Sequence, residues 1–336
     1  MGKATELTLK DGEDYAGVNP LEALENIKKR FQEKKEGKKS LRKTALVLQG
    51  GGMRGVFGAG VCCALEELGY TKAFDEVYGV SAGALNAAYF LSGQAAYGAT
   101  IYYQDINNRK FIHFFRFKKI MDIDFLMEVI YHKKPLNLKR LLSNPTSFNV
   151  VLTRVSTGEA VIFKLEKAAD IFSILKATCA LPFAYDIPVD VGGEKYLDGG
   201  VSCPIPLKEA IEGGCTDIMV VFTRPKDYEP GRSKFSEILD YLLVEPRIKK
   251  HGQKFFEVYK KRESFYREII HILKEKNSRE KKANILCVFP GSSLKVKRVT
   301  KKKSLLKKAL IEGAIKTLKL FGEENFYPAE VFKFLN

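Results

Sequence analysis

A serine lies in the run Gly79-Val80-Ser81-Ala82-Gly83, with one glycine two positions before it and another two positions after it. The run follows a short apolar stretch that predicts a strand and precedes an apolar segment that predicts a helix. A serine on such a sharp turn is strained and needs small neighbours, here Gly79 and Gly83. The helix also directs its positive N-terminus at the serine, which favours developing negative charge. The pattern predicts Ser81 as a nucleophile; the alternative is a turn in which Ser81 only caps the helix.

The glycine-rich run from Gly50 to Gly55 follows the first predicted strand and has two interpretations. It matches the G-x-G-x-x-G pattern of dinucleotide sites, which also needs an acidic residue at the end of the second strand. Because the second strand here ends in the serine turn, the dinucleotide interpretation is disfavoured. Consecutive glycines otherwise leave backbone N–H groups bare, as an oxyanion hole requires. We predict that Gly50, Gly51 and Gly52 form this hole, and that Arg54 orients the loop or pairs with a carboxylate or phosphate.

A nucleophilic serine needs a general base. Asp198 follows the strand-like run Lys195-Tyr196-Leu197 and precedes two glycines, so its carboxylate lies at a strand end with little around it. This favours Asp198 as a base that takes the Ser81 proton directly. The alternative is that Asp-Gly-Gly only forms a sharp turn. No histidine lies in a loop at the end of a predicted strand; the four are His113, His132, His251 and His271.

The elements that must position these residues alternate between strand and helix. Buried strands are predicted at residues 45–48, 77–80, 218–223 and 285–289, and helices at 56–68, 84–91, 168–180, 233–277 and 304–321. Residues 148–153 and 159–164 predict a hairpin that turns at residues 156–158. The sequence therefore predicts an α/β fold, a three-layer α/β/α sandwich with a mostly parallel central sheet.

The chain divides into three predicted parts. Residues 1–43 are expected to hold a polar tail, a linker and a short amphipathic helix, with Asn19 as its N-cap and Pro20 at its first position. Residues 44–225 are expected to form the catalytic domain. Residues 226–336 are expected to form a basic, mainly helical extension that packs on this domain.

Together the three motifs resemble the patatin-like phospholipase family. Gly50–Gly55 is similar to the family's glycine-arginine oxyanion loop, and Gly79–Gly83 to its nucleophile elbow. Asp198-Gly199-Gly200 is similar to its Asp-Gly-Gly/Ala element, and the motifs follow the family's order. The run Ala177–Pro182 resembles the segment before that aspartate. The resemblance covers roughly residues 44–225, and the part beyond is similar to the bacterial branch with a helical extension.

The resemblance implies a lipid acyl hydrolase of the phospholipase A, lysophospholipase or carboxylesterase type. Ser81 and Asp198 would form its catalytic dyad without a histidine, and neither a metal nor another cofactor is implied. The expected substrate is a phospholipid or another acyl ester. Two alternatives stay open: an acyl thioesterase at the same site, and a non-catalytic protein that binds anionic membranes.

The net charge of +16 is concentrated in one part of the chain, because residues 245–308 carry 21 basic and 6 acidic residues. Such an excess attracts anionic lipid headgroups or nucleic acid, and no zinc-finger, KH or RRM signature favours nucleic acid. Candidate membrane contacts are the aromatic and basic segment 111–131, the basic segment formed by Arg298 and the lysines between 295 and 308, and an amphipathic helix at 304–321. The alternatives are helices that pack on the core and a solvated lysine-rich face.

The cysteines and the distribution of apolar residues indicate the cellular compartment. The six cysteines form no C-x-x-C pair, which is typical of reduced, buried thiols. The longest nearly uncharged stretch, residues 79–94, is shorter than a bilayer helix, and residues 1–14 lack the apolar centre of a signal peptide. We therefore expect a cytoplasmic protein with peripheral contact to an anionic membrane.

Overall fold

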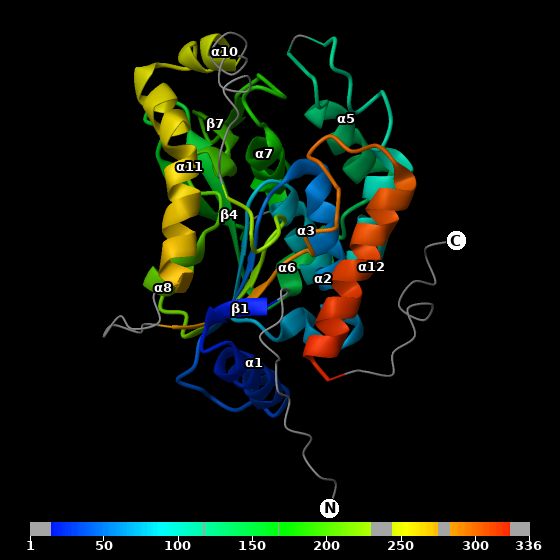
Figure 1. Ribbon diagram of the computed structural model, residues 1–336, viewed down its shortest axis with the longest axis vertical. Helices are drawn as coiled ribbons and strands as arrows, with labels where there is room; N and C mark the ends of the chain where they lie inside the picture. Colours follow the sequence, from blue (N-terminus) through cyan, green and yellow to red (C-terminus); the bar gives the residue numbers. More distant parts are fainter. Residues whose placement is uncertain (1–14, 117, 167, 230–243, 275–282, 323–336) are drawn as a thin grey trace, which may run out of the picture.

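The computed structural model describes residues 15–116, 118–166, 168–229, 244–274 and 283–322 (Figure 1). Within these residues the strands form one nine-stranded sheet in the order β1-β9-β8-β2-β3-β4-β7-β6, with β5 paired to β4. The strands are β1 Tyr15–Val18, β2 Thr44–Leu48, β3 Glu76–Gly79, β4 Ser147–Arg154, β5 Ala160–Lys164, β6 Val189–Val191, β7 Glu194–Asp198, β8 Asp217–Val221 and β9 Asn284–Val288.

Helices flank this sheet and connect its strands. The α-helices are α1 Pro20–Lys35, α2 Val56–Glu67, α3 Ala82–Leu91, α4 Ala95–Ala99, α5 Ile123–Glu128, α6 Leu138–Ser143, α7 Ala168–Cys179, α8 Leu207–Glu212, α10 Glu245–Lys249, α11 Gln253–Lys274 and α12 Lys303–Leu320. Two predicted segments lie partly outside the described residues. These are the helical stretch, at residues 233–243 and 275–277, and the polar tail, at residues 1–14. Phe117 also lies outside them.

The centre of the sheet is parallel and its margins are antiparallel. The neighbouring strands β9, β8, β2, β3 and β4 pair in parallel, whereas β1, β5, β6 and β7 pair antiparallel. Strands β2 and β8 are buried along their whole length, as expected for parallel strands covered on both faces. The predicted parallel core and the predicted β4–β5 hairpin are therefore confirmed.

Alternate side chains of β2 face two separate hydrophobic layers. Leu46 and Leu48 pack in the layer that contains α2, α3 and α12, whereas Ala45 and Val47 pack with α8 and α11. Figure 1 shows α11 on one side of the sheet and α2, α3 and α12 on the other. The predicted three-layer α/β/α sandwich is confirmed.

The predicted helix near the C-terminus, α12, packs on the core with its apolar face. Leu306, Leu310 and Ala314 are buried, and α12 crosses α2 closely. A Cβ atom added to Gly60 would lie 2.0 Å from the Leu310 carbonyl oxygen, and one added to Gly313 would lie 2.2 Å from the Phe57 carbonyl oxygen. The apolar face of this helix is therefore covered by protein and is not a membrane-binding face.

Residues 15–18, predicted as polar tail, instead form the edge strand β1, which pairs with β9. Helix α1 begins at Pro20 as predicted and contacts the amino ends of the parallel strands. Asn19 occupies the predicted N-cap position, and its carbonyl accepts from the Ala23 N–H at 3.0 Å. Its side chain makes no capping bond, and its amide donates instead to Asn284 Oδ1 at 3.0 Å. The division of the chain at residues 44 and 225 stays a prediction, although β9 and α12 beyond it are part of the sandwich.

Two further observations bear on the sequence expectations. All six cysteines are buried and make no disulfide. Among the described residues, no helix combines the length and the apolar composition that crossing a bilayer requires.

Candidate active site

The carboxyl ends of neighbouring parallel strands bring the sequence motifs to one edge of the sheet. The glycine loop follows β2, Ser81 follows β3, and Arg224 follows β8. In open α/β sheets this edge is where ligands bind. The topology therefore explains why motifs far apart in the sequence meet here.

Ser81 occupies a sharp turn between β3 and α3. Its backbone φ of 54° lies in the left-handed region, which costs about 1–3 kcal/mol for a residue with a side chain. A Cβ atom on Gly79 would lie 2.5 Å from the Ala84 Cα, and one on Gly83 would lie 2.2 Å from the Leu48 carbonyl oxygen. These contacts are with backbone atoms, so both neighbours must be glycine for the turn to form.

Asp198 reaches Ser81 because β3 and β7 lie on the same side of β4. Residues 149–153 of β4 pair with β5 on one side, so β3 and β7 must both use the other. On that side Gly79 lies opposite Val150 and Asp198 lies opposite Leu152. The carboxyl ends of β3 and β7 therefore face each other along β4. They lie opposite residues two positions apart, a separation of about 7 Å at ~3.3 Å per residue.

The Asp198 carboxylate is buried, and it is held in place by polar contacts. Its Oδ1 accepts a hydrogen bond from the Gly200 N–H at 2.8 Å, and the Ser81 hydroxyl lies in the same cavity and stabilises the charged carboxylate. Burial raises the pKa of Asp198 to about 6, while the Gly200 N–H, the Ser81 hydroxyl and the Arg298 charge oppose this rise. The carboxylate is therefore ionised near neutral pH and poised to accept a proton.

The glycine loop lies against the same serine. A Cβ atom on Gly50 would come within 2.8 Å of the Ser81 Cβ, and Gly52 has a positive φ of 57°. Thr223 fixes the loop, because its hydroxyl donates to the Gly50 carbonyl at 2.7 Å and its N–H donates to Gln49 Oε1 at 2.7 Å. Within the described part of the chain, the N–H groups of Gly50 and Gly51 donate to no protein acceptor.

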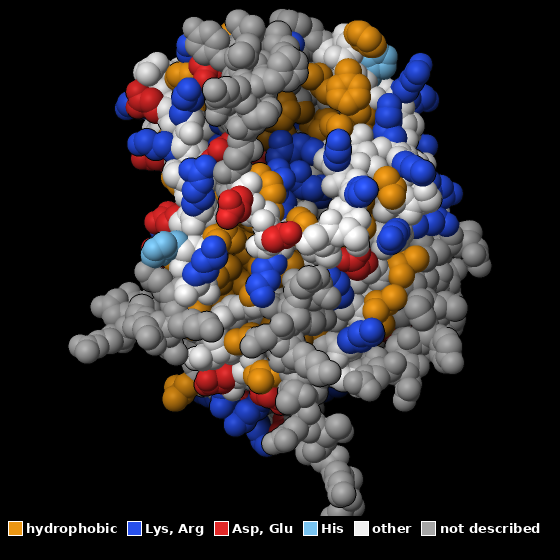
Figure 2. All heavy atoms as spheres, viewed as in Figure 1, with side chains coloured by type: hydrophobic (Ala, Val, Ile, Leu, Met, Phe, Trp, Pro, Cys, Tyr) orange, Lys and Arg blue, Asp and Glu red, His pale blue; other side chains and the backbone are white. Residues whose placement is uncertain are grey.

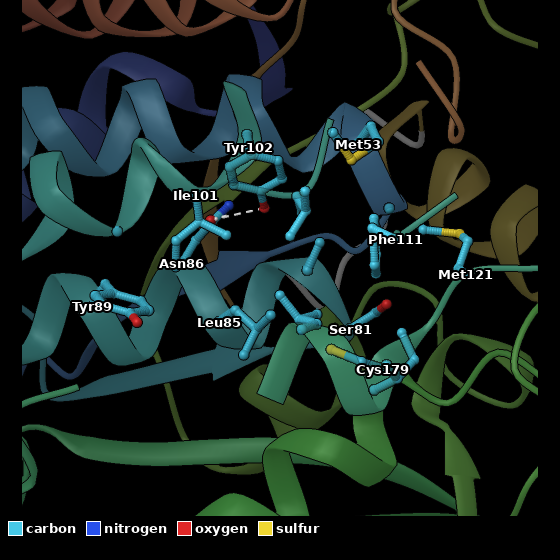
Figure 3. Close-up of a pocket in the computed structure, with 16 residues that line it drawn as sticks. Met53, Ser81, Leu85, Asn86, Tyr89, Ile101, Tyr102, Phe111, Met121 and Cys179 are labelled. Atoms are coloured by element: carbon cyan, nitrogen blue, oxygen red, sulfur yellow. Dashed lines mark hydrogen bonds between the residues drawn. The ribbon is translucent and has the colours of Figure 1, made fainter. Parts of the chain in front are cut away.

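Two cavities meet at Ser81. The first is a narrow, mainly apolar pocket whose lining includes Leu85, Ile101 and Phe111. Figure 3 shows Ser81 and Cys179 at one end of this pocket and Tyr89 at the other. The Asn86 amide is satisfied by the Tyr102 hydroxyl and the Gly55 carbonyl, so it leaves no unpaired polar group in the apolar wall.

The second cavity, of about 450 Å³, is polar. It contains Ser81 and Asp198 together with the glycine loop and Arg54. The structure thus brings all of the predicted site residues to one place, with Gly79 and Gly83 supporting the turn. Neither cavity is lined by a histidine, and His251 instead pairs with the buried Asp186 at 2.8 Å. No cluster of three His, Cys, Asp or Glu side chains suited to a metal exists among the described residues.

The sequence motifs missed several residues of this site. Thr178 links the elbow to β4, because its hydroxyl accepts from the Ser81 N–H at 2.9 Å and donates to the Val151 carbonyl at 2.8 Å. The Ala82 N–H follows the serine at the start of α3, where such elbows place an oxyanion donor. Arg224 and Arg298 line the polar cavity. Ala82 lies in the serine run and Thr178 in the run Ala177–Pro182, although neither was assigned a role. Arg224 directly follows a predicted buried strand, and Arg298 lies in the predicted basic segment.

Comparisons with known proteins agree with this geometry. Residues 46–211 match the family model described as Patatin-like phospholipase. The Escherichia coli protein named Uncharacterized protein YjjU is 33% identical over 187 residues, covering 54% of this chain and 52% of that protein. The mouse protein named 1-acylglycerol-3-phosphate O-acyltransferase Pnpla3 is 29% identical over 180 residues, covering 50% of this chain and 42% of that protein.

The chain thus aligns with about half, or less, of the length of these two relatives. A solved structure of VipD from Legionella pneumophila is also similar, with a TM-score of 0.42, 13% identity and coverage of 84% of this chain and 67% of that one. The family match spans β2 to α8 and includes the glycine loop, Ser81 and Asp198. Residues 46–211 of this chain are therefore a domain of the patatin-like phospholipase family.

Proposed function

We propose that the protein hydrolyses acyl esters of lipids, with Ser81 as nucleophile and Asp198 as general base. The observation that carries this proposal is that the strained Ser81 shares one cavity with a buried carboxylate whose pKa is about 6. A base works best when its pKa lies near the operating pH. Nucleophile and base are also positioned by rigid strands of one sheet.

The proposed reaction proceeds through an acyl-enzyme. Asp198 takes the Ser81 proton as the Ser81 Oγ attacks the ester carbonyl carbon, which forms a tetrahedral intermediate. The intermediate collapses as its C–O bond to the alcohol breaks, and Asp198 returns the proton to the departing oxygen. Water then attacks the acyl-enzyme while Asp198 accepts its proton, and the acid leaves as Ser81 Oγ regains that proton.

Backbone N–H groups are proposed to stabilise the oxyanion of each intermediate. The unpaired N–H groups of Gly50 and Gly51 and the N–H of Ala82 are the candidate donors. Each such donor typically stabilises the transition state by about 2.7–4 kcal/mol. The apolar pocket would then hold the acyl chain, because it opens beside Ser81 and its lining is mainly apolar.

The proposal is tested by labelling with a fluorophosphonate probe and by hydrolysis of p-nitrophenyl butyrate. We expect wild type to label and to hydrolyse the ester. Ser81→Ala should abolish labelling and lower kcat/KM by at least about 1,000-fold. Asp198→Asn should lower kcat/KM by at least about 100-fold, since Asn cannot accept the proton.

Matched variants control for general effects of these substitutions. Ser143→Ala removes an exposed serine on α6, and Asp190→Asn removes an exposed carboxylate on β6. Both should label and react as wild type does. A folded wild type that neither labels nor hydrolyses the ester, or a Ser81→Ala protein that keeps its activity, would overturn the proposal. Butyryl thioester assayed in parallel decides between ester and thioester preference.

A further inference from the structure

The polar cavity beside Ser81 carries an excess of positive charge. Its charged lining residues are four arginines, Arg54, Arg224, Arg262 and Arg298, against the two carboxylates of Asp198 and Glu263, a net of +2. Figure 2 shows Lys and Arg side chains lining a hollow in the upper centre of this face, between α11 and α12. A cleft lined by one sign of charge concentrates ions of the opposite sign.

Arg54, Arg224 and Arg298 form no salt bridge with a carboxylate of the described residues. Glu263 pairs with Arg267 at 3.8 Å, and the Arg262 guanidinium donates to the Tyr259 carbonyl at 2.8 Å. Within the described residues, by contrast, Arg54, Arg224 and Arg298 form no ion pair, and the buried Arg54 Nε has no hydrogen-bond partner. All three arginines are partly buried, and charges withdrawn from water are ordinarily paired, so this arrangement is costly without an anion.

The three guanidinium groups also act on one another. Burial lowers the pKa of Arg54, and the charges of Arg298 and Arg224 lower it further. Burial likewise lowers the pKa of Arg298, with Asp198 opposing and Arg224 adding to the effect. Like charges held together in this way repel, and a bound anion would relieve the repulsion.

We propose that Arg54, Arg224 and Arg298 form a subsite that binds the phosphate of an anionic glycerophospholipid whose ester lies at Ser81. This inference rests on the proposed function. Arginine suits such a ligand because its planar fork donates two parallel hydrogen bonds to phosphate oxygens.

The subsite adjoins the reacting atoms. Arg298 lies against the glycine loop: its carbonyl accepts from the Met53 N–H at 3.0 Å, and a Cβ atom on Gly52 would lie 2.7 Å from its Cγ. Gly52 and Ser81 border both the apolar pocket and the polar cavity. A lipid bound with its acyl chain in the pocket therefore places its headgroup among the arginines.

The cavity favours a headgroup without a cation. Quaternary ammonium groups are recognised by aromatic faces, but here guanidinium groups already cover two of them. Arg224 lies 3.7 Å from the centre of the Tyr228 ring, and Arg262 lies 3.7 Å from that of Tyr259. We therefore expect phosphatidylglycerol to react better than phosphatidylcholine.

Two of the three arginines lie outside residues 46–211, the part that matches the family model. Arg224 follows β8, and Arg298 lies in the segment between β9 and α12. The subsite is therefore a property that the C-terminal part of this chain adds to the patatin-like domain.

The test compares dihexanoyl phosphatidylglycerol with dihexanoyl phosphatidylcholine, both as monomers, so that attraction to a charged membrane plays no part. Wild type should show a kcat/KM at least about tenfold higher for phosphatidylglycerol, a difference of about 1.4 kcal/mol. Arg224→Gln should lower the ratio of phosphatidylglycerol to p-nitrophenyl butyrate hydrolysis about tenfold, and Arg224→Lys should recover part of it. Lys226→Gln, which removes an exposed charge two residues away, should keep the wild-type ratio.

Inorganic phosphate is tested separately as an inhibitor of p-nitrophenyl butyrate hydrolysis. Weaker inhibition of Arg224→Gln than of wild type supports the subsite. Phosphate inhibition without any discrimination between the two lipids would assign the arginines to a free anion and overturn the headgroup proposal. The headgroup proposal would also be overturned if both lipids reacted at equal rates and Arg224→Gln kept the wild-type ratio of phosphatidylglycerol to p-nitrophenyl butyrate hydrolysis. The esterase proposal would be unaffected by that result, because p-nitrophenyl butyrate hydrolysis reports the dyad alone.

Discussion

At the scale of single residues, the ionisation of Asp198 links structure to activity. Burial raises the pKa of this carboxyl from its usual 3.8 to about 6. The Gly200 N–H, the Ser81 hydroxyl and the charge of Arg298 lower the pKa but only partly offset this rise. The proposed base works only when ionised. Its pKa therefore sets the lower pH limit of the reaction.

We predict that kcat/KM for p-nitrophenyl butyrate rises about tenfold per pH unit below pH 6 and levels off above it. Arg298→Gln removes a positive charge that lowers the pKa of Asp198, so its profile should shift to higher pH. Lys302→Gln, at an exposed position near the start of α12, serves as the control and should follow wild type. A wild-type profile that is flat between pH 5 and 8 would exclude Asp198 as the base.

Local motifs predicted the elbow, the glycine loop and Asp198, because each depends on a few consecutive residues. Gly79 and Gly83, for example, are required by contacts with backbone atoms close to the turn. Arg298 had no such signal and was interpreted from sequence as part of a basic surface segment. Its place in the cavity depends on the path of the chain after β9, which no local pattern encodes.

At the scale of elements, α12 packs on α2 through two glycines. Gly60 of α2 faces the Leu310 carbonyl, and Gly313 of α12 faces the Phe57 carbonyl. Glycine in a helix interior destabilises the helix by about 0.5–1 kcal/mol relative to alanine. At these two positions it allows the backbones of α2 and α12 to approach each other closely. The close crossing offsets this loss of helix stability because it buries Leu306, Leu310 and Ala314.

We predict that Gly60→Ala lowers the free energy of unfolding by about 1–3 kcal/mol, because the new methyl group would push the helices apart. This loss should exceed the gain in helix propensity. Urea unfolding followed by circular dichroism measures the balance. Lys308→Ala on the exposed side of α12 is the control and should change stability by less than about 0.5 kcal/mol. An equal or greater stability of Gly60→Ala would show that the crossing is not tightly packed.

The strands that the sequence did not predict are β1 and β6. Each has four residues or fewer and is interrupted, β1 by Gly17 and β6 by Asp190, so neither forms an apolar run that could be recognised. Strand β1 also depends on pairing with β9, whose residues lie at the other end of the sequence. Long, fully apolar strands such as β8 carry their own signal and were predicted.

At the scale of the whole molecule, an exposed aromatic segment lies near a basic one. Phe115 is 96% and Phe114 61% exposed, and with Lys301 they line a shared hollow. Phe111 and Met121, on either side of the exposed pair in sequence, line the apolar pocket. A membrane that received these phenylalanines would therefore lie close to the proposed acyl site.

We predict that the protein binds vesicles containing phosphatidylglycerol, and that binding weakens as salt is raised from 0.05 to 0.5 M. Phe115→Ser should weaken binding because a large apolar side chain is lost at the contact. Leu41→Ser, an equally exposed apolar residue on the loop after α1, is the control and should bind as wild type does. Sedimentation with vesicles measures each case. Equal binding to neutral and anionic vesicles would contradict the prediction.

The pairing of β1 with β9 constrains how this chain acquires its structure during synthesis. Residues 15–18 are made about 270 residues before their partners at 285–288. Domains can begin to fold while a chain is still growing. Here the earliest described strand has no partner until residues 285–288 have been made, and Arg298 reaches the site later still. The candidate site and its sheet are therefore completed only after residue 298 has been made, and a chain released before that residue lacks one of the three arginines.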